Sequence, residues 1–238
     1  MELRERLVHD ATESCPYIDG ETARMPLRWQ MRHLSGEELD AALADGDRRV
    51  GRMLYRTSCP SCTACEALRI PVDEFRPKKS QRRVWRKNQD IKVTVGPAKF
   101  SQERLDLYNR HKRERGLSRD GKEMTQQGYE GWFINTCVQT MELCFSLNEK
   151  LVGVSIVDVG ARDTSSVYHY FDPDLSGRSL GTFSALVEMA WCRTRRGRFH
   201  YMGLYVGECD RLNYKARFLP HERRVDGEWI RMGKEGDQ

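Results

Sequence analysis

The sequence predicts a mixed α/β (α+β) fold in which helices pack on a mixed sheet, and three observations support this class. From about residue 101 onward, the expected elements follow in the order helix, hairpin, strand, glycine-containing turn, helix, strand, helix and strand. The chain has 238 residues, enough to bury a substantial core. Four of the eight cysteines lie before residue 76. We therefore expect a small cysteine-containing N-terminal subdomain over residues 1–76 and a larger domain over residues 77–238.

The expected elements of the first 76 residues are short. CPYIDGETARM has the composition of a loop. SGEELDAALADGD predicts a helix, with Ser35 as its N-cap and Glu38 completing a capping box. LRIPV predicts a strand.

The larger domain begins with a basic helix and continues with alternating strands and helices. IKVTV is a strand ended by Gly96-Pro97, and Ser101 caps a helix that places Leu105 and Tyr108 on neighbouring turns. The next helix, in TFSALVEMAWCRTRRG, repeats apolar residues at helical spacing and ends at Gly197. The other expected elements are a hairpin of MELCFSL and LVGVSIVDV around residues 148–150, strands SSVYHYF, FHYMGLYV and EWIRM, and a short helix DRLNYKARF.

Composition limits the function classes. Charged residues make up 32% and hydrophobic residues 39% of the chain, and no apolar run approaches the ~20 residues that span a bilayer. The N-terminal stretch MELRERLVHDATESCPYIDG lacks the apolar segment of a signal peptide. We therefore expect a cytoplasmic protein with no membrane partner, in which the cysteines stay reduced.

A cysteine cluster at residues 15, 59, 62 and 65 is a candidate metal site. Cys59, Cys62 and Cys65 follow a C-x-x-C-x-x-C spacing, and Cys15 could supply a fourth thiolate if its loop folds back. Four thiolates suit zinc or an iron–sulfur cluster, and the spacing does not choose between them. Small buried cysteines are the structural alternative. We interpret the other four cysteines as packing residues.

A run of cations follows the cysteines. Seven Lys and Arg residues lie between residues 76 and 87, with no acidic residue until Asp90. On a helix over residues 79–87, five of them form one positive face, on which Trp85 could stack on an unpaired base or anchor the helix. Such a face suits nucleic-acid phosphates better than a merely solvated surface. The candidate nucleic-acid-binding residues are Lys79, Arg82, Arg83, Trp85, Arg86 and Lys87, and for these the family resemblance given below implies tRNA as the partner.

The order of elements in the larger domain resembles the N-acetyltransferase-like (GNAT) acyltransferase fold. In that fold the turn before the main helix often reads Arg/Gln-x-x-Gly-x-Gly/Ala, and its N–H groups bind the phosphates of the acyl carrier. Here the turn runs from Arg178 through Ser179, Gly181 and Thr182 to Phe183. Phenylalanine replaces the last small residue, which argues against coenzyme A.

A closer resemblance covers nearly the whole chain. Cys15-Pro16-Tyr17, the three cysteines running into LRIPV, SQRR at residues 80–83, YHYFDPDL at 168–175 and YKARF at 214–218 resemble the bacterial aminoacyl-tRNA–protein transferases, specifically the aspartate/glutamate leucyltransferases. The resemblance implies transfer of leucine from leucyl-tRNA to proteins with N-terminal Asp or Glu, which marks them for degradation by downstream machinery. It also implies kinship with the arginyltransferases, so arginine is the alternative donated residue. A small-molecule N-acetyltransferase of the same fold, a cell-wall peptide aminoacyltransferase and a cysteine-metal nucleic-acid-binding module are the other readings.

The implied chemistry selects candidate residues. The aminoacyl ester of tRNA is already activated, so no nucleotide cofactor is required, but an α-amine of pKa ≈ 7.7–8.0 must lose a proton before it attacks. Discrimination of the acceptor needs cations that pair with its carboxylate when this is buried. Lys215 is a candidate both for this pairing and for catalysis. The candidate catalytic residues are Tyr170, Asp172, Tyr205, Tyr214 and Lys215, with Tyr168 close by; the candidate substrate-binding residues are Arg69, Arg178, Ser179, Gly181, Thr182 and Arg217. Packed strand tyrosines, a turn aspartate and surface arginines are the structural alternatives.

Overall fold

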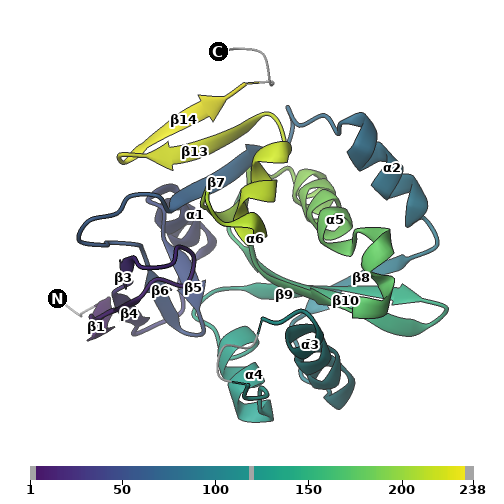
Figure 1. The fold of residues 1–238 in the computed structure, drawn as a ribbon, viewed down its shortest axis with the longest axis horizontal. Coiled ribbons are helices and arrows are strands. Elements are labelled where there is room, and N and C mark those ends of the chain that lie inside the picture. Colours follow the sequence, from purple (N-terminus) through teal and green to yellow (C-terminus); the bar gives the residue numbers. More distant parts are fainter. Residues whose placement is uncertain (1–3, 118–120, 234–238) are drawn as a thin grey trace.

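The computed structural model describes residues 4–117 and 121–233. Its centre is an eight-stranded mixed sheet in the order β14-β13-β7-β12-β11-β10-β9-β8 (Figure 1). β11 and β12 are parallel, and all other neighbours in this sheet are antiparallel. The strands are β7 (Glu66–Pro71), β8 (Lys92–Pro97), β9 (Thr140–Leu147), β10 (Lys150–Val159), β11 (Thr164–Phe171), β12 (Phe199–Tyr205), β13 (His221–Val225) and β14 (Glu228–Met232). The predicted mixed α/β class with a mixed sheet is confirmed.

Helices cover both faces of this sheet (Figure 1). Tyr108 of α3 and Tyr129 of α4 pack on one face, against Ile156, whereas Phe183 of α5 packs on the other face with Val157. Because both faces are covered, β10 is buried along nearly its whole length and its sequence is mostly apolar. The helices are α1 (Gly36–Ala44), α2 (Lys79–Lys87), α3 (Gln102–Glu114), α4 (Gln126–Phe133), α5 (Leu180–Thr194) and α6 (Asp210–Asn213), with 3-10 turns η1 (Pro173–Arg178) and η2 (Tyr214–Arg217).

The N-terminal part forms two small antiparallel sheets beside the large one. The first has the order β1-β4-β6-β5 and the second pairs β2 with β3. Their strands are β1 (Glu5–His9), β2 (Thr12–Ser14), β3 (Thr22–Arg24), β4 (Leu27–Gln30), β5 (Arg48–Val50) and β6 (Met53–Tyr55). The next strand, β7, lies inside the large sheet between β12 and β13. The division at residue 76 stays a prediction.

Several local predictions are confirmed. Ser35 and Glu38 form the expected capping box, and Ser101 caps α3. The β9–β10 hairpin turns at Asn148 and Glu149, whose φ angles of 48° and 64° are typical of a type I′ turn. No helix in the described ranges is long and apolar enough to cross a membrane.

The parallel strands β11 and β12 separate soon after they meet. They pair only at Thr164 with His200 and at Ser165 with Tyr201. Beyond this point β12 bulges against β7 between Tyr201 and Gly203, where Gly203 has φ +88°. A bulge bends its strand, and a positive φ is easy for glycine alone. The bend leaves β11 and β12 open toward their C-terminal ends.

Candidate active site

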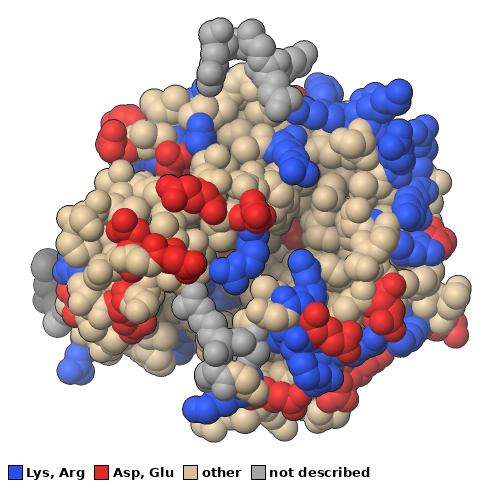
Figure 2. Space-filling model, viewed as in Figure 1, with Lys and Arg blue, Asp and Glu red and all other residues tan. Residues whose placement is uncertain are grey.

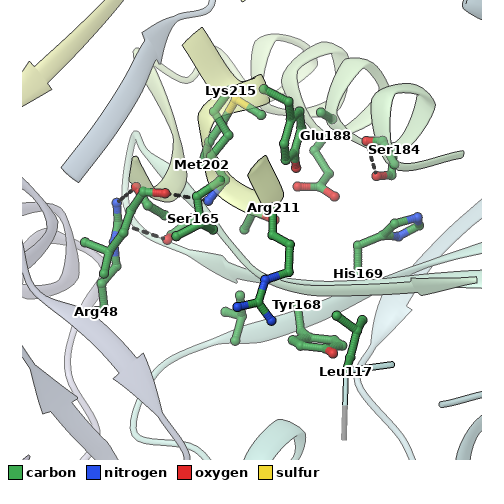
Figure 3. A pocket seen from close by; sticks show the side chains of 18 of the residues that line it. Arg48, Leu117, Ser165, Tyr168, His169, Ser184, Glu188, Met202, Arg211 and Lys215 are labelled. Carbon is green, nitrogen blue, oxygen red and sulfur yellow. Dashed lines mark hydrogen bonds between the residues drawn. The ribbon is translucent and has the colours of Figure 1, made fainter. Parts of the chain in front are cut away.

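A cavity of about 900 Å³ lies where β11 and β12 separate. The strand pair opens there, so side chains from both strands and from the start of α5 face a common space. Figure 3 shows Arg48 on one side of this space and His169 with Glu188 on the other. Residues used below that line it are Tyr17, Arg48, Arg115, Ser165, Tyr168, His169, Ser179, Gly181, Thr182, Glu188, Gly203, Leu204, Arg211, Tyr214 and Lys215.

Arg48 reaches the cavity from β5 and joins the two separated strands. Its Nη1 donates to Ser165 Oγ of β11 at 3.4 Å, and its Nη2 donates to the Gly203 carbonyl of β12 at 2.7 Å. Its Nε is buried without a hydrogen-bond partner. Burial lowers the pKa of Arg48, but a guanidinium remains protonated in proteins. Arg48 therefore brings a full positive charge to the cavity wall.

Lys215 of η2 lies beside Arg48. Its Nζ donates to the carbonyl of Leu204 at 2.7 Å. Leu204 directly follows Gly203, whose carbonyl accepts from Arg48. Burial lowers the pKa of Lys215 to about 7, and the charge of Arg48 contributes in the same direction. Near neutral pH a substantial fraction of Lys215 is therefore uncharged and able to accept a proton.

The opposite wall carries the half-buried His169 and the buried Glu188, which lies against the buried His200. Glu188 of α5 lies with its Oε2 3.2 Å from His200 Nε2, and His169 Nδ1 lies 2.9 Å from Ser155 Oγ. Although burial opposes ionisation of Glu188, the neighbouring ring of His200 holds the pKa of this carboxyl below its usual range. Burial lowers the pKa of His169 to about 4, so this ring is neutral at pH 7. This wall offers polar atoms to a ligand in the cavity.

The predicted catalytic residues separate into two groups. Tyr214 and Lys215 line the cavity. Tyr170 is fully buried with its hydroxyl 2.7 Å from that of Tyr129, and Asp172 caps η1 and pairs with cations. Tyr205 lies under the guanidinium of Arg223. These last three are held by neighbours and are not among the residues that line the cavity.

The predicted substrate-binding residues separate in the same way. Ser179, Gly181 and Thr182 line the cavity at the N-terminus of α5, where helix N–H groups favour anions. Arg178 instead forms a bidentate ion pair with Asp90, in which Nη1 and Nη2 donate to the two carboxylate oxygens at 2.7 and 2.9 Å.

Arg69 and Arg217 also lie away from the cavity lining. Arg69 pairs with Glu222 at 2.6 Å and stacks between the rings of Phe199 and Trp229. Arg217 is exposed. Among these cations, Lys215 is the one that the sequence motifs and the cavity have in common.

The four N-terminal cysteines are reduced and half-buried next to the cavity. The pKa of Cys65 is raised to about 12 by burial and then by the nearby thiols of Cys59, Cys15 and Cys62, which shows that the four are neighbours. The Tyr17 N–H donates to Cys15 Sγ at 3.4 Å, and Tyr17 lines the cavity. Thiols are suitable ligands for zinc or iron, yet the described ranges hold no group of three or more His, Cys, Asp or Glu side chains placed to hold a metal ion. The metal site stays a prediction.

The basic helix α2 has the predicted bounds and is exposed. Lys79, Arg82, Arg83, Trp85, Arg86 and Lys87 all face solvent, and Figure 2 shows blue side chains gathered along this edge of the molecule. Trp85 packs edge-on against Phe183 of α5 with ring centroids 5.6 Å apart, so it anchors the helix and keeps part of its ring exposed. Lys87 Nζ donates to the carbonyl of Gly177. The positive face therefore ends beside the η1–α5 turn, which also borders the cavity.

Sequence reasoning missed Arg48, His169 and Glu188. Arg48 stands in DRRVGR, which has the composition of a surface turn, and Glu188 is one acid in an otherwise apolar helix. An acid on the apolar face of an amphipathic helix was the available signal for Glu188. No local pattern marks Arg48, because its burial depends on β11 and β12.

Comparisons with known proteins agree over most of the chain. Residues 13–83 match the family model "Arginine-tRNA-protein transferase, N terminus", and residues 103–225 match "Arginine-tRNA-protein transferase, C terminus". An aspartate/glutamate leucyltransferase of Marinobacter nauticus is 34% identical over 218 residues, 92% of each chain. One from Aeromonas hydrophila is 33% identical over 215 residues, 90% of each chain. The crystal structure of FemX aligns with 82% of this chain and 79% of its own, with a TM-score of 0.45 and 9% identity.

Proposed function

The chain belongs to the arginine-tRNA-protein transferase family, and from this premise we propose that it transfers leucine from leucyl-tRNA to proteins that begin with Asp or Glu. The observation that best supports this proposal is the sequence identity of 33–34% to aspartate/glutamate leucyltransferases over about nine tenths of the chain. The products would enter N-degron protein degradation in the cytoplasm. Arginine is the second candidate donor, because the matching family models carry the description of arginine-tRNA-protein transferases.

The cavity between β11 and β12 is the proposed reaction site. The acceptor's α-amine attacks the ester carbonyl of the aminoacyl-tRNA, a C–N bond forms, and the C–O bond to the terminal ribose breaks. One proton leaves the amine and one is gained by the ribose oxygen. Lys215, with its pKa lowered to about 7, is the proposed proton acceptor. N–H groups at the start of α5 face the same space and could stabilise the oxyanion.

We further propose that residues 77–238 form a GNAT-like acyltransferase domain. The support is the opening between two parallel strands, with the helix that follows the first strand beginning at the opening. The turn from Arg178 to Thr182 lies there, but the fork of Arg178 is occupied by Asp90. This pairing agrees with an acyl donor other than coenzyme A.

Transfer assays with defined donors and acceptors test the proposal. Purified protein is incubated with radiolabelled leucyl-tRNA or arginyl-tRNA and with peptides beginning in Asp, Glu, Arg or Ala, without ATP or coenzyme A. We expect label from leucyl-tRNA on the Asp- and Glu-peptides alone. Turnover of acetyl-CoA without any tRNA-dependent transfer would contradict the proposal.

Zinc or an iron–sulfur cluster on Cys15, Cys59, Cys62 and Cys65 is a separate proposal. Its support is the chemistry of four neighbouring thiols and the backbone N–H groups of Tyr17 and Arg24, which donate to the sulfurs of Cys15 and Cys59. The transfer steps above pass through no metal. Elemental analysis of the purified protein, with a Cys59→Ser/Cys62→Ser variant as control, tests it, and metal-free protein that is folded would make these cysteines packing residues.

A further inference from the structure

The cavity contains two buried cations that form no ion pair with a carboxylate among the described residues. Arg48 and Lys215 are 5% and 8% exposed, and neither forms an ion pair within residues 4–117 and 121–233. Their partners are neutral: a hydroxyl and a carbonyl for Arg48, and a carbonyl for Lys215. A buried charge is costly unless it is paired with an opposite charge. This wall is therefore suited to an anionic ligand.

The nearest carboxylates are engaged elsewhere. Asp158 pairs with Arg49 at 2.6 Å, and Asp47 pairs with Arg28 at 2.6 Å and with Arg56 at 3.1 Å. Arg48 and Arg49 are neighbours on the same short strand and are both buried, but only Arg49 has its carboxylate. Because Arg49 shows how this fold neutralises a buried arginine, the neutral contacts of Arg48 indicate a partner from outside the chain.

The two cations are placed to hold one small group of atoms. The bulge at Gly203 lets the consecutive carbonyls of Gly203 and Leu204 accept hydrogen bonds from Arg48 and Lys215, both at 2.7 Å. Their charges lie close enough for Arg48 to affect the pKa of Lys215. An N-terminal aspartate or glutamate carries a side-chain carboxylate and an α-amine a few bonds apart. These groups match a guanidinium beside an amine that can accept a proton.

We propose that Arg48 binds the side-chain carboxylate of the acceptor's first residue and so selects Asp and Glu over Asn and Gln. This assignment rests on the proposed function. A guanidinium binds a carboxylate in a planar fork, and its Nε has no partner in the structure. With the carboxylate on Arg48, the α-amine of the same residue lies toward Lys215. Selection of the acceptor and removal of its proton then take place side by side.

A tRNA phosphate is the other anion available to this enzyme, and the positions of the cations argue against it. Arg115 and Arg211 are exposed at the cavity border, and the cations of α2 are exposed on the outer surface. The phosphates of a large polyanion contact such exposed cations before any buried one. Arg48 lies behind them on the inner wall, where a single side chain fits more readily than a nucleic-acid backbone.

Binding of matched peptides tests the assignment independently of catalysis. The dissociation constants of Asp- and Asn-headed peptides of otherwise identical sequence are measured by calorimetry on the unmodified protein and on Arg48→Gln, Arg48→Lys and Arg193→Gln. A charge-assisted hydrogen bond changes affinity by roughly 10- to 100-fold. We expect the unmodified protein and R193Q, which loses an exposed cation of α5, to prefer the Asp-peptide by this factor. In R48Q the ratio should approach one, and R48K should lie between because it lacks the fork.

Each outcome decides the question. Equal affinity of the unmodified protein for the two peptides would overturn the assignment, as would an R48Q variant that keeps its preference. So would weaker leucyl-tRNA binding by R48Q with the preference intact, since Arg48 would then hold a phosphate. If R48Q does not fold, R48K decides, and an undiminished Asp preference in it counts against Arg48. A preference that depends on Arg48 supports the assignment even if no leucine is transferred, in which case the proposed function fails instead.

Discussion

At the scale of single residues, burial in the cavity changes what ordinary side chains can do. Lys215 would be charged at every physiological pH in water, but burial lowers its pKa to about 7. Arg48 keeps its charge in the same wall because a guanidinium cannot be deprotonated there. Two basic side chains in one wall thus take different roles: Lys215 becomes a proton acceptor and Arg48 remains a permanent charge.

Replacement of Lys215 by Met should slow transfer without weakening tRNA binding. Loss of a general base typically reduces the rate by about 10²- to 10⁴-fold. In the unmodified protein, kcat/KM should rise with pH through about 7, because the free amine of Lys215 is the active form. The pH–rate profile of K215M should lack this limb and keep only the titration of the acceptor amine. A variant with an unchanged profile would exclude Lys215 as the base.

Gly203→Ala should damage both stability and activity. Gly203 has φ +88°, and a Cβ there would lie 3.4 Å from Lys215 Nζ. We expect a loss of about 1–2 kcal/mol in the free energy of unfolding, because alanine is strained in this region. Gly207→Ala is the matched control, since φ is ordinary there and the nearest contact is Tyr205 Oη at 3.5 Å. Denaturant unfolding of both variants checks the prediction, and equal stability would contradict it.

At the scale of elements, the sequence predicted those features that are stabilised by residues close together in the chain. Ser35 and Ser101 cap their helices as expected, since a cap and its N–H partner lie within one turn. In α5, whose apolar residues recur at helical spacing, the apolar Ala190 is exposed, while the acidic Glu188 is buried against His200. α4, the small N-terminal sheets and β13 were missed.

The missed elements depend on distant partners. β13 has the polar sequence HERRV and is a strand because it pairs with β14 along its whole length and with β7 at Glu222 and Arg223. Dependence on distant partners also separates the cavity residues that the sequence predicted from those that it did not. Lys215 and the Arg178–Thr182 turn stand in recognisable motifs, whereas Arg48 depends on the separation of two strands more than a hundred residues later in the sequence.

The basic helix α2 should contribute to tRNA affinity as an element. Arg82, Arg83 and Arg86 are exposed along it. Their replacement by Gln should raise KM for leucyl-tRNA with every acceptor and reduce the salt dependence by about 0.9 unit of slope per lost phosphate contact. The ratio of Asp- to Asn-peptide use should stay constant. Kinetics at several salt concentrations test this, with Arg193→Gln as the control, and an unchanged salt slope would remove α2 from the tRNA surface.

At the scale of the whole molecule, three histidines with lowered pKa values should make the fold sensitive to acid. Burial lowers the pKa of His111, His169 and His221 to about 4, against 6.5 for an exposed ring. Between these values the unfolded chain binds more protons than the folded one. Their contribution to stability is therefore complete above pH 6.5 and is lost as pH falls toward 4.

Unfolding experiments between pH 7 and 4 should show this loss. We expect the free energy of unfolding to decline already between pH 6.5 and 5, before most carboxylates titrate. His221→Gln should make the decline shallower, because Gln can keep a donor toward the Phe218 carbonyl without titrating. Constant stability of the unmodified protein from pH 6.5 to 5 would show that these rings do not control it.

The position of β7 within the large sheet has a consequence for how the protein is made. Residues 66–71 form a strand whose two neighbours are residues 199–205 and 221–225. A ribosome synthesises the strand long before either neighbour, so both of its edges remain open while more than a hundred further residues are added. Apolar strands with open edges associate with other chains. Nascent chains halted between β7 and β12 should therefore require chaperone protection that the finished protein does not.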